Sequence, residues 1–97
     1  MDLSIIIVNY KTKELLRQCL DSLLSLECAL NYEIIVVDND SKDGSTAMIR
    51  NEYKSVLLIE NHENAGLSKG NNDGAEKASG KSLLFMNPDT VVKPGSL

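Results

Sequence analysis

Two carboxylates stand at the ends of apolar, strand-like segments, where they could take part in chemistry. Asp89 follows the segment 82–86, within the tetrad 87–90, and Asp38 directly ends the segment 33–37. In an open α/β sheet, ligands bind in the crevice outside the carboxyl ends of the strands. A carboxylate there is a candidate for ligand chemistry, and Asp38 is placed to accept hydrogen bonds from a nucleobase or a ribose.

Three other side chains have both a functional and an ordinary interpretation. Tyr10, after the first apolar segment, could stack on a nucleobase or pack over the first turn of the following helix. Lys69 could offer its ammonium group to a phosphate near a helix N-terminus, or it could be a solvated surface lysine. His62, the only histidine, fits a solvated loop residue better than a general base or a ligand.

Two common kinds of ligand site are disfavoured by what surrounds these residues. A dinucleotide-binding turn needs glycines after the first strand, and the chain has no glycine before Gly44. A calcium loop of the EF-hand type needs a later glutamate and a flanking helix pair, which the acidic stretch 38–44 lacks. Within that stretch, Asp43 or Ser41 is better assigned to capping a helix.

The spacing of apolar residues predicts the elements that position these side chains. Continuous apolar segments typical of buried parallel strands lie at residues 3–8, 33–37, 56–59 and 82–86. Helical patterns separate them, at about 12–24 with Thr12 as the N-cap, from near 45 to before 53, and at about 67–78. The third helix should bury a stripe that includes Leu67 and Gly74, and Gly74 predicts close packing against the sheet. The order βαβαβαβ predicts an α/β fold with helices on both faces of a mostly parallel, four-stranded sheet.

The composition is that of one small domain and disfavours several partners. A chain of 97 residues with 42% hydrophobic and 25% charged residues is ordinary for a globular protein with one core. Its net charge of −4 gives no basic surface for nucleic acid or an anionic membrane. No apolar run approaches the roughly 20 residues of a transmembrane segment, and no signal peptide is visible, so we expect a cytoplasmic protein. Cys19 and Cys28 are expected to be free thiols, with Cys19 in the core.

Five motifs follow one another along the chain: Ile7-Val8-Asn9-Tyr10, Val37-Asp38-Asn39-x-Ser41-x-Asp43-Gly44, Asn64-x-Gly66-x-x-x-Gly70-Asn71-Asn72-x-Gly74, Ala78-x-Gly80 and Asn87-Pro88-Asp89-Thr90. In this order and at the expected spacing, they resemble the N-terminal half of family 2 glycosyltransferases, and most closely the branch with bacterial rhamnosyltransferase-like enzymes. The resemblance implies a GT-A fold, here a three-layer, Rossmann-like half-domain. It further implies that residues 1–97 are the donor-binding part of a longer domain truncated at its C-terminus, since residues 93–97 look like the entry to a further helix.

The resemblance also implies a set of site residues. In this family the residue at Asp38 contacts the nucleotide, helped by Asn9 and Tyr10. The motif after the fourth strand usually reads Asp-x-Asp, and its last carboxylate binds a divalent metal, Mg²⁺ or Mn²⁺, that bridges the donor's diphosphate. Because Asn87 takes the first position here, Asp89 is the sole anionic metal ligand of the motif, which implies weaker metal binding or a dispensable metal. The full donor-binding set that we predict is Asn9, Tyr10, Asp38, Asn39, Lys69, Asn72 and Asn87.

The implied reaction is transfer of a sugar, with inversion, from a nucleotide-diphosphate sugar to an acceptor hydroxyl in bacterial cell-surface polysaccharide synthesis. The acceptor would be a glycan or a lipid-linked molecule. The family's catalytic base lies in its C-terminal half, so we expect no catalytic residue within 1–97 and no activity of the isolated chain. The parent enzyme is expected in the cytoplasm, either free or peripheral at the inner face of the membrane.

A receiver-like regulatory module is the alternative from a non-enzyme class. Such a module needs an acidic cluster that includes the end of the first strand, and here that strand ends on Asn9.

A final expectation concerns assembly. A truncated sheet should expose an edge strand and apolar surface, and should therefore form a homodimer or exchange elements between copies.

Overall fold

The computed structural model describes residues 1–25 and 31–91 and has the predicted alternation of strands and helices. The elements are β1 (Leu3–Asn9), α1 (Lys13–Leu24), β2 (Tyr32–Asn39), α2 (Ser45–Glu52), β3 (Leu57–Asn61), α3 (Leu67–Lys77) and β4 (Ser82–Met86). These strands form one sheet in the order β3-β2-β1-β4, and every neighbouring pair is parallel. The α/β fold is therefore confirmed, with a sheet that is wholly parallel across the described residues.

Three strands run further than the apolar pattern alone predicts, and β1 does so by one residue, to Asn9. β2 continues through Asp38 and Asn39, and β3 ends at Asn61. The sheet register continues through these polar residues, pairing Asp38 with Glu60 and Asn39 with Asn61. Residues predicted to follow the strands are therefore part of the sheet itself.

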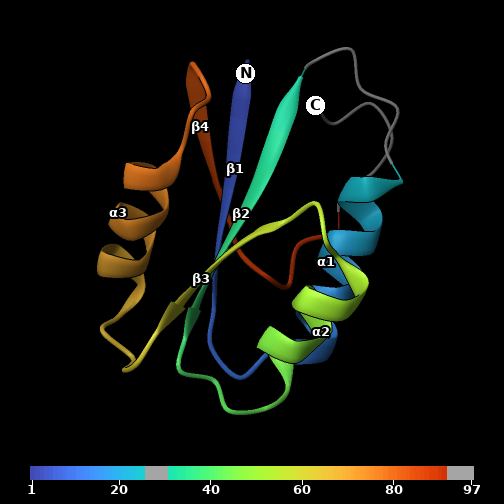
Figure 1. Cartoon of the computed structure of the whole chain (residues 1–97), viewed down its shortest axis with the longest axis vertical. Helices are drawn as coiled ribbons and strands as arrows, with labels where there is room; N and C mark the ends of the chain where they lie inside the picture. Colours follow the sequence, from blue (N-terminus) through green and yellow to red (C-terminus); the bar gives the residue numbers. More distant parts are fainter. Residues whose placement is uncertain (26–30, 92–97) are drawn as a thin grey trace.

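The helices cover both faces of the sheet, giving three layers (Figure 1). Alternate residues of a strand point to opposite faces, which is why β1 and β2 are apolar along their length. On the face covered by α1 and α2, Ile5 and Ile7 pack with Leu16 and Leu20 in the larger core. On the face covered by α3, a smaller core contains Ile6, Val8, Ile35 and Val37, with Ala75 and Ala78 against it.

Two glycines let α3 lie close to the sheet. A Cβ atom added at Gly70 would lie 2.7 Å from Val8 Cγ1, and one at Gly74 would lie 2.5 Å from Ile6 Cγ2. The close packing predicted for Gly74 is confirmed. The prediction that Leu67 belongs to the buried stripe is wrong, because Leu67 is 59% exposed. The stripe instead runs through Gly70 and Gly74, since this short helix–sheet distance leaves no room for larger side chains.

Cys19 is a core residue of α1, as predicted. Its side chain is fully buried and unbridged. Burial, and secondarily the negative charge of Asp89, raises the pKa of the Cys19 thiol to about 11, which keeps it protonated at neutral pH. Cys28 and residues 93–97, for which the sequence also gave expectations, lie outside the described residues.

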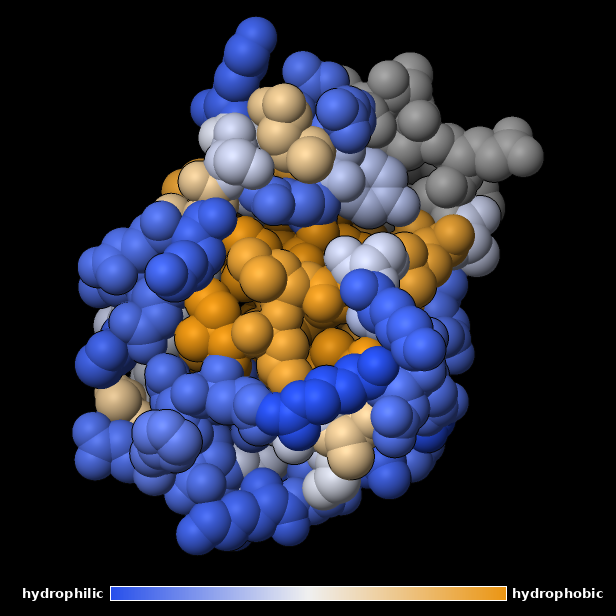
Figure 2. All heavy atoms as spheres, in the orientation of Figure 1, coloured by the Kyte–Doolittle hydropathy of each residue, from blue (hydrophilic) through white to orange (hydrophobic). Residues whose placement is uncertain are grey.

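Both edges of the sheet carry exposed apolar side chains. Figure 2 shows apolar residues gathered at the centre of the face seen in Figure 1, over the sheet between α3 and the α1–α2 pair. Leu57 on edge strand β3 is 44% exposed, and Leu83 and Phe85 on edge strand β4 are 43% and 49% exposed.

Across residues 1–25 and 31–91, no helix has the length and apolar character needed to span a bilayer.

Candidate functional site

The carboxyl ends of β1 and β2 meet in a buried polar network. The sheet register pairs Asn9 with Asp38, and Asn9 Nδ2 donates a hydrogen bond of 2.8 Å to Asp38 Oδ1. Ser41 donates twice to the same carboxylate, from its hydroxyl to Oδ1 at 2.7 Å and from its backbone N–H to Oδ2 at 3.1 Å. Asn9 is fully buried, and Asp38 and Ser41 are each 2% exposed. Asp38 thus lies at the predicted strand end, with its oxygens already bonded to protein donors.

Asp43 stands at the start of both helices on this face. Its Oδ1 accepts the N–H of Ser45, the first residue of α2, at 3.0 Å, and its Oδ2 accepts the N–H of Lys13, the first residue of α1, at 3.3 Å. Burial raises the pKa of the Asp43 carboxyl, but the hydrogen bonds from Ser45 and Lys13 outweigh it and hold the pKa below its ordinary value. The predicted capping role of Asp43 is therefore confirmed.

Thr12 is the N-cap residue of α1, as predicted, but its side chain makes no capping hydrogen bond. Its hydroxyl donates to Asn9 Oδ1 at 2.6 Å instead. This bond links two residues that stand three positions apart, at the end of β1 and at the start of α1. The amide side chain of Asn9 is consequently bonded at both its nitrogen and its oxygen.

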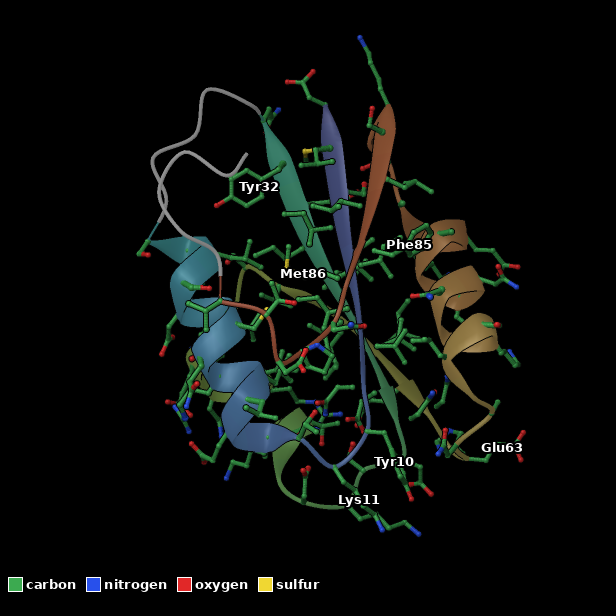
Figure 3. The ribbon with its side chains drawn as sticks, turned by 180° about the vertical axis from the view of Figure 1, so that it is seen from behind. Tyr10, Lys11, Tyr32, Glu63, Phe85 and Met86 are labelled. Atoms are coloured by element: carbon green, nitrogen blue, oxygen red, sulfur yellow. The ribbon has the colours of Figure 1, made fainter. Side chains whose placement is uncertain are left out.

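Tyr10 and Lys11 form the exposed tip of this region. Figure 3 places both at the end of the sheet where β1 finishes, far from Tyr32 at the opposite end. The Tyr10 side chain is on the surface, with the residue 41% exposed, so its ring is not buried under α1. Lys11 Nζ lies 5.2 Å from the centroid of that ring, within the range of a cation–π contact. The Lys11 backbone N–H donates to Ser41 Oγ at 2.9 Å.

Asn39 joins the end of β2 to the start of α3. Its Nδ2 donates to the carbonyl oxygen of Gly66 at 3.2 Å, and its Oδ1 accepts from Asn61 Nδ2 at 2.8 Å. Asn39 is 1% exposed. These bonds fix the N-terminus of α3 at the same end of the sheet as Tyr10.

Lys69 is near this end but is paired within its own helix. Its Nζ lies 3.0 Å from Asp73 Oδ1, and the hydrogen bond from Lys69 lowers the pKa of Asp73 while raising its own. Asp73 also accepts from Asn61 Nδ2 at 3.2 Å, which connects the pair to Asn39. A hollow of about 310 Å³ is lined by Asn61, His62, Glu63, Ala65 and Lys69.

Asn72 is the second predicted site residue on α3, three positions after Lys69. It is exposed, and it is two positions from both Gly70 and Gly74, which face the sheet. Residues two apart on a helix point in nearly opposite directions. Asn72 therefore lies on the outer face of α3.

Asn87 and Asp89 follow β4, and both are exposed. The loop that contains them begins on the α1 side of the sheet, because the sulfur of Met86, the last residue of β4, lies 3.8 Å from Cys19 Sγ in α1. Residues 1–25 and 31–91 contain no group of three or more histidine, cysteine or acidic side chains arranged to hold a metal ion. One carboxylate with one amide oxygen nevertheless fits Mg²⁺ or a similar cation that takes most of its ligands from water and a bound diphosphate.

The structure brings Asn9, Tyr10, Asp38 and Asn39 together, and it adds two residues that the sequence did not select as site residues. Ser41 was assigned to a helix cap, although its position three residues after Asp38 is typical of a side-chain turn. Nothing in the sequence singles out Lys11 as a site residue. Its backbone is left-handed, a conformation that is unusual for lysine and so is not expected from the sequence. The ligand-binding roles of the predicted residues stay predictions.

Comparison with protein families gives one match over nearly the whole chain. The model described as "Glycosyl transferase family 2" matches residues 4–97. The uncharacterised glycosyltransferase YfnE of Bacillus subtilis is 37% identical over 94 residues, which are 95% of this chain and 24% of YfnE. The poly(ribitol-phosphate) beta-glucosyltransferase of Bacillus spizizenii is 34% identical over 97 residues, covering 95% of this chain and 15% of that enzyme. The chain thus spans a quarter or less of these two relatives.

Solved structures share the fold. TarS 1–349 of S. aureus, in complex with UDP-GlcNAc, superposes with a TM-score of 0.82 at 25% identity, covering 92% of this chain and 27% of that one. The mannosyltransferase PcManGT of Pyrobaculum calidifontis, in complex with GDP-Man and Mn²⁺, has a TM-score of 0.81 at 24% identity and covers 90% and 27% of the two chains. Nothing in these relatives and structures supports the receiver-like alternative.

Proposed function

The chain belongs to glycosyltransferase family 2, and on that premise we propose that it carries the binding site for a nucleotide-diphosphate sugar donor. The observation that carries the proposal is the pairing of an exposed aromatic ring, Tyr10, with a buried network beneath it at the carboxyl ends of β1 and β2. This is the end of a parallel sheet at which ligands bind. The complex of TarS with UDP-GlcNAc, a protein of the same fold, supports a uridine nucleotide as a donor component.

In this proposal the residues of the site divide into two groups. Tyr10 stacks on the nucleobase with its exposed ring. Asn9, Asp38 and Asn39 are almost fully buried and hydrogen-bonded, so they shape the site by holding the two strand ends in place. A rigid frame lowers the cost of binding, because less freedom is lost when the ligand arrives.

The diphosphate is proposed to lie towards the loop after β4. Within the motif 87–90, Asp89 would supply the one anionic ligand to Mg²⁺ or Mn²⁺, and Asn87 a neutral oxygen. A divalent cation there neutralises the negative charge of the diphosphate. PcManGT, solved with GDP-Man and Mn²⁺, supports the use of such a cation.

Lys69 and Asn72 are the remaining proposed donor contacts. To reach a phosphate, the Lys69 ammonium group must either contact the phosphate and Asp73 together or give up its ion pair with Asp73.

The parent enzyme is proposed to transfer the sugar with inversion to a hydroxyl of a glycan or lipid-linked acceptor. Poly(ribitol-phosphate) beta-glucosyltransferase, as a relative, supports a role in bacterial cell-surface polysaccharide synthesis, in the cytoplasm or at the inner face of the membrane. Membership of the rhamnosyltransferase-like branch is part of this proposal. The catalytic base is proposed to lie outside residues 1–97, so this chain alone should not transfer sugar.

The test is a calorimetric titration of the chain with UDP and with dTDP, each with and without Mn²⁺. We expect binding of at least one nucleotide at millimolar concentration or below, strengthened by Mn²⁺. Asp89→Ala should remove the effect of Mn²⁺ and leave metal-free binding unchanged. Asp2→Ala, which removes an exposed carboxylate at the start of β1, is the matched control and should keep the Mn²⁺ effect. Absence of binding at millimolar nucleotide would contradict the proposal.

Self-association through the β4 edge is a separate proposal. β4 pairs only with β1 among the described strands, and Leu83 and Phe85 are both about half-exposed on it. Figure 3 shows Phe85 towards α3 and Met86 towards α1. An unpaired strand edge beside apolar surface favours pairing with a second copy. Light scattering at ~100 µM, where weak contacts should be populated, is expected to detect dimers that Leu83→Lys reduces. A monomer at that concentration would contradict the proposal.

A further inference from the structure

We infer that Ser41 is a positioning residue for the nucleotide site, an inference that rests on the donor-binding function proposed above. Ser41 lies in the loop after β2, whereas Tyr10 and Lys11 lie in the loop after β1. The Ser41 side chain joins the two loops through the Lys11 N–H. This N–H belongs to the peptide unit that follows Tyr10, so the bond fixes the backbone from which the Tyr10 ring projects.

The Ser41 hydroxyl uses its whole hydrogen-bonding capacity. A serine hydroxyl has one donor hydrogen and two acceptor lone pairs. In the structure the hydrogen goes to Asp38 Oδ1 at 2.7 Å, and the oxygen accepts from the Lys11 N–H at 2.9 Å and from Asn9 Nδ2 at 3.3 Å. Ser41 is 2% exposed, so water does not readily replace any of these partners. Only a hydroxyl on a short side chain can supply all three bonds here.

The backbone around this hydroxyl adopts unfavourable conformations that need support. Lys11 has φ 55°, and the residues on either side of Ser41, Asp40 and Lys42, have φ 61° and 54°. These are the positive-φ residues other than glycine among the described part of the chain. Left-handed backbone costs an L-residue about 1–2 kcal/mol, and such residues persist when surrounding contacts hold them. The hydrogen bond from the Lys11 backbone N–H to Ser41 Oγ holds this residue in its left-handed conformation.

The hydroxyl is not needed to form the loop after β2 itself. The backbone N–H of Ser41 donates to Asp38 Oδ2, and that bond closes the turn whatever side chain stands at position 41. Asn9 also keeps its bonds to Asp38 and Thr12 when the hydroxyl is removed. Loss of the hydroxyl should therefore release the Tyr10–Lys11 tip selectively. The fraction of molecules with the tip in its binding conformation falls, and apparent affinity falls by the same factor.

The experiment compares Ser41→Ala with Ser41→Thr, which keeps the hydroxyl, and with the control Ser45→Ala. Ser45 is a buried serine four residues later, whose hydroxyl donates to Asp43 and makes no contact with Lys11. Each chain is titrated with UDP and Mn²⁺ by calorimetry, and hydrogen exchange of the Lys11 amide is followed by NMR. If the NMR spectrum shows that Ser41→Ala is unfolded, Ser41→Cys takes its place, because cysteine nearly keeps the side-chain volume and weakens the same hydrogen bonds.

For Ser41→Ala we expect UDP affinity to fall roughly fivefold to tenfold, in keeping with a lost hydrogen bond, and Lys11 amide exchange to accelerate at least tenfold. Ser41→Thr should restore both values to within twofold of wild type, and Ser45→Ala should change neither. Wild-type affinity in Ser41→Ala, or an equal loss in Ser45→Ala, would overturn the inference. If the wild-type chain binds neither UDP nor dTDP, the proposed function fails first, and the inference falls with it.

Discussion

Asn9 and Asp38 are register partners on neighbouring strands, and the Asn9 side-chain amide donates to the Asp38 carboxylate at 2.8 Å with both residues buried. The predicted nucleotide-binding aspartate is therefore also a structural residue. Its removal affects the sheet end as well as any ligand.

Asp38→Ala is accordingly expected to destabilise the fold. The change leaves Asn9 Nδ2 and two Ser41 donors without their acceptor, and a buried unsatisfied group costs about 1–3 kcal/mol. Urea denaturation should show a lower free energy of unfolding for Asp38→Ala. Asp40→Asn, a neutralised aspartate in the same loop, is the matched control and should stay close to wild type. Unchanged stability in Asp38→Ala would show that the network contributes little.

Tyr10→Ala is expected to weaken UDP binding without weakening the fold. The Tyr10 side chain is exposed, and stacking of a base on an aromatic ring is worth about 1–3 kcal/mol, so affinity should fall at least fivefold. Tyr10→Phe keeps the ring and should bind within twofold of wild type. Calorimetry gives the affinities and thermal unfolding checks the fold. Equal affinities for the alanine and wild-type chains would refute stacking by this ring.

Gly74→Ala is expected to lower stability although alanine favours helices. The new Cβ would meet Ile6 Cγ2 at 2.5 Å, and forcing extra volume into a packed core costs about 1–3 kcal/mol. Glu76→Ala, at an exposed position of the same helix, serves as control and should be neutral or slightly stabilising. A Gly74→Ala chain as stable as wild type would mean that α3 can move off the sheet at little cost.

Asp43 should make stability depend on acid pH. Its folded-state pKa is below the ordinary value of 3.8, so the stability it contributes is present above that value and is lost as pH falls through the lower, folded pKa. Asp43→Asn should therefore be less stable than wild type at pH 7, and the difference should shrink towards pH 2. Urea denaturation at several pH values measures it. A difference that stayed constant with pH would contradict this role.

The sequence predicted the elements well, because strands buried on both faces are continuously apolar and α1 has a clear apolar face. It missed the ends of β2 and β3, where Asp38, Asn39 and Asn61 continue the sheet although they are polar. It predicted that Gly74 packs against the sheet, but it wrongly placed Leu67 in the buried stripe of α3 and did not foresee that Gly70 also faces the sheet. For the candidate site, the sequence predicted which polar residues stand at the strand ends, but it did not predict the hydrogen bonds that these side chains make with one another. The three partners of the Ser41 hydroxyl lie at the ends of β1 and β2 and in the loop after β1, and those on β1 and in its loop are about thirty residues from Ser41 in the sequence.

The most direct test of the donor site maps where the nucleotide binds. The chain labelled with ¹⁵N is titrated with UDP in the presence of Mg²⁺, and amide shifts are followed by NMR. The largest shifts are predicted around Tyr10, at the ends of β1 and β2, and in the loop that contains Asp89. Shifts confined to the opposite end of the sheet, around the hollow lined by Leu24, Tyr32 and Ser55, would contradict the account, as would no shifts at millimolar UDP.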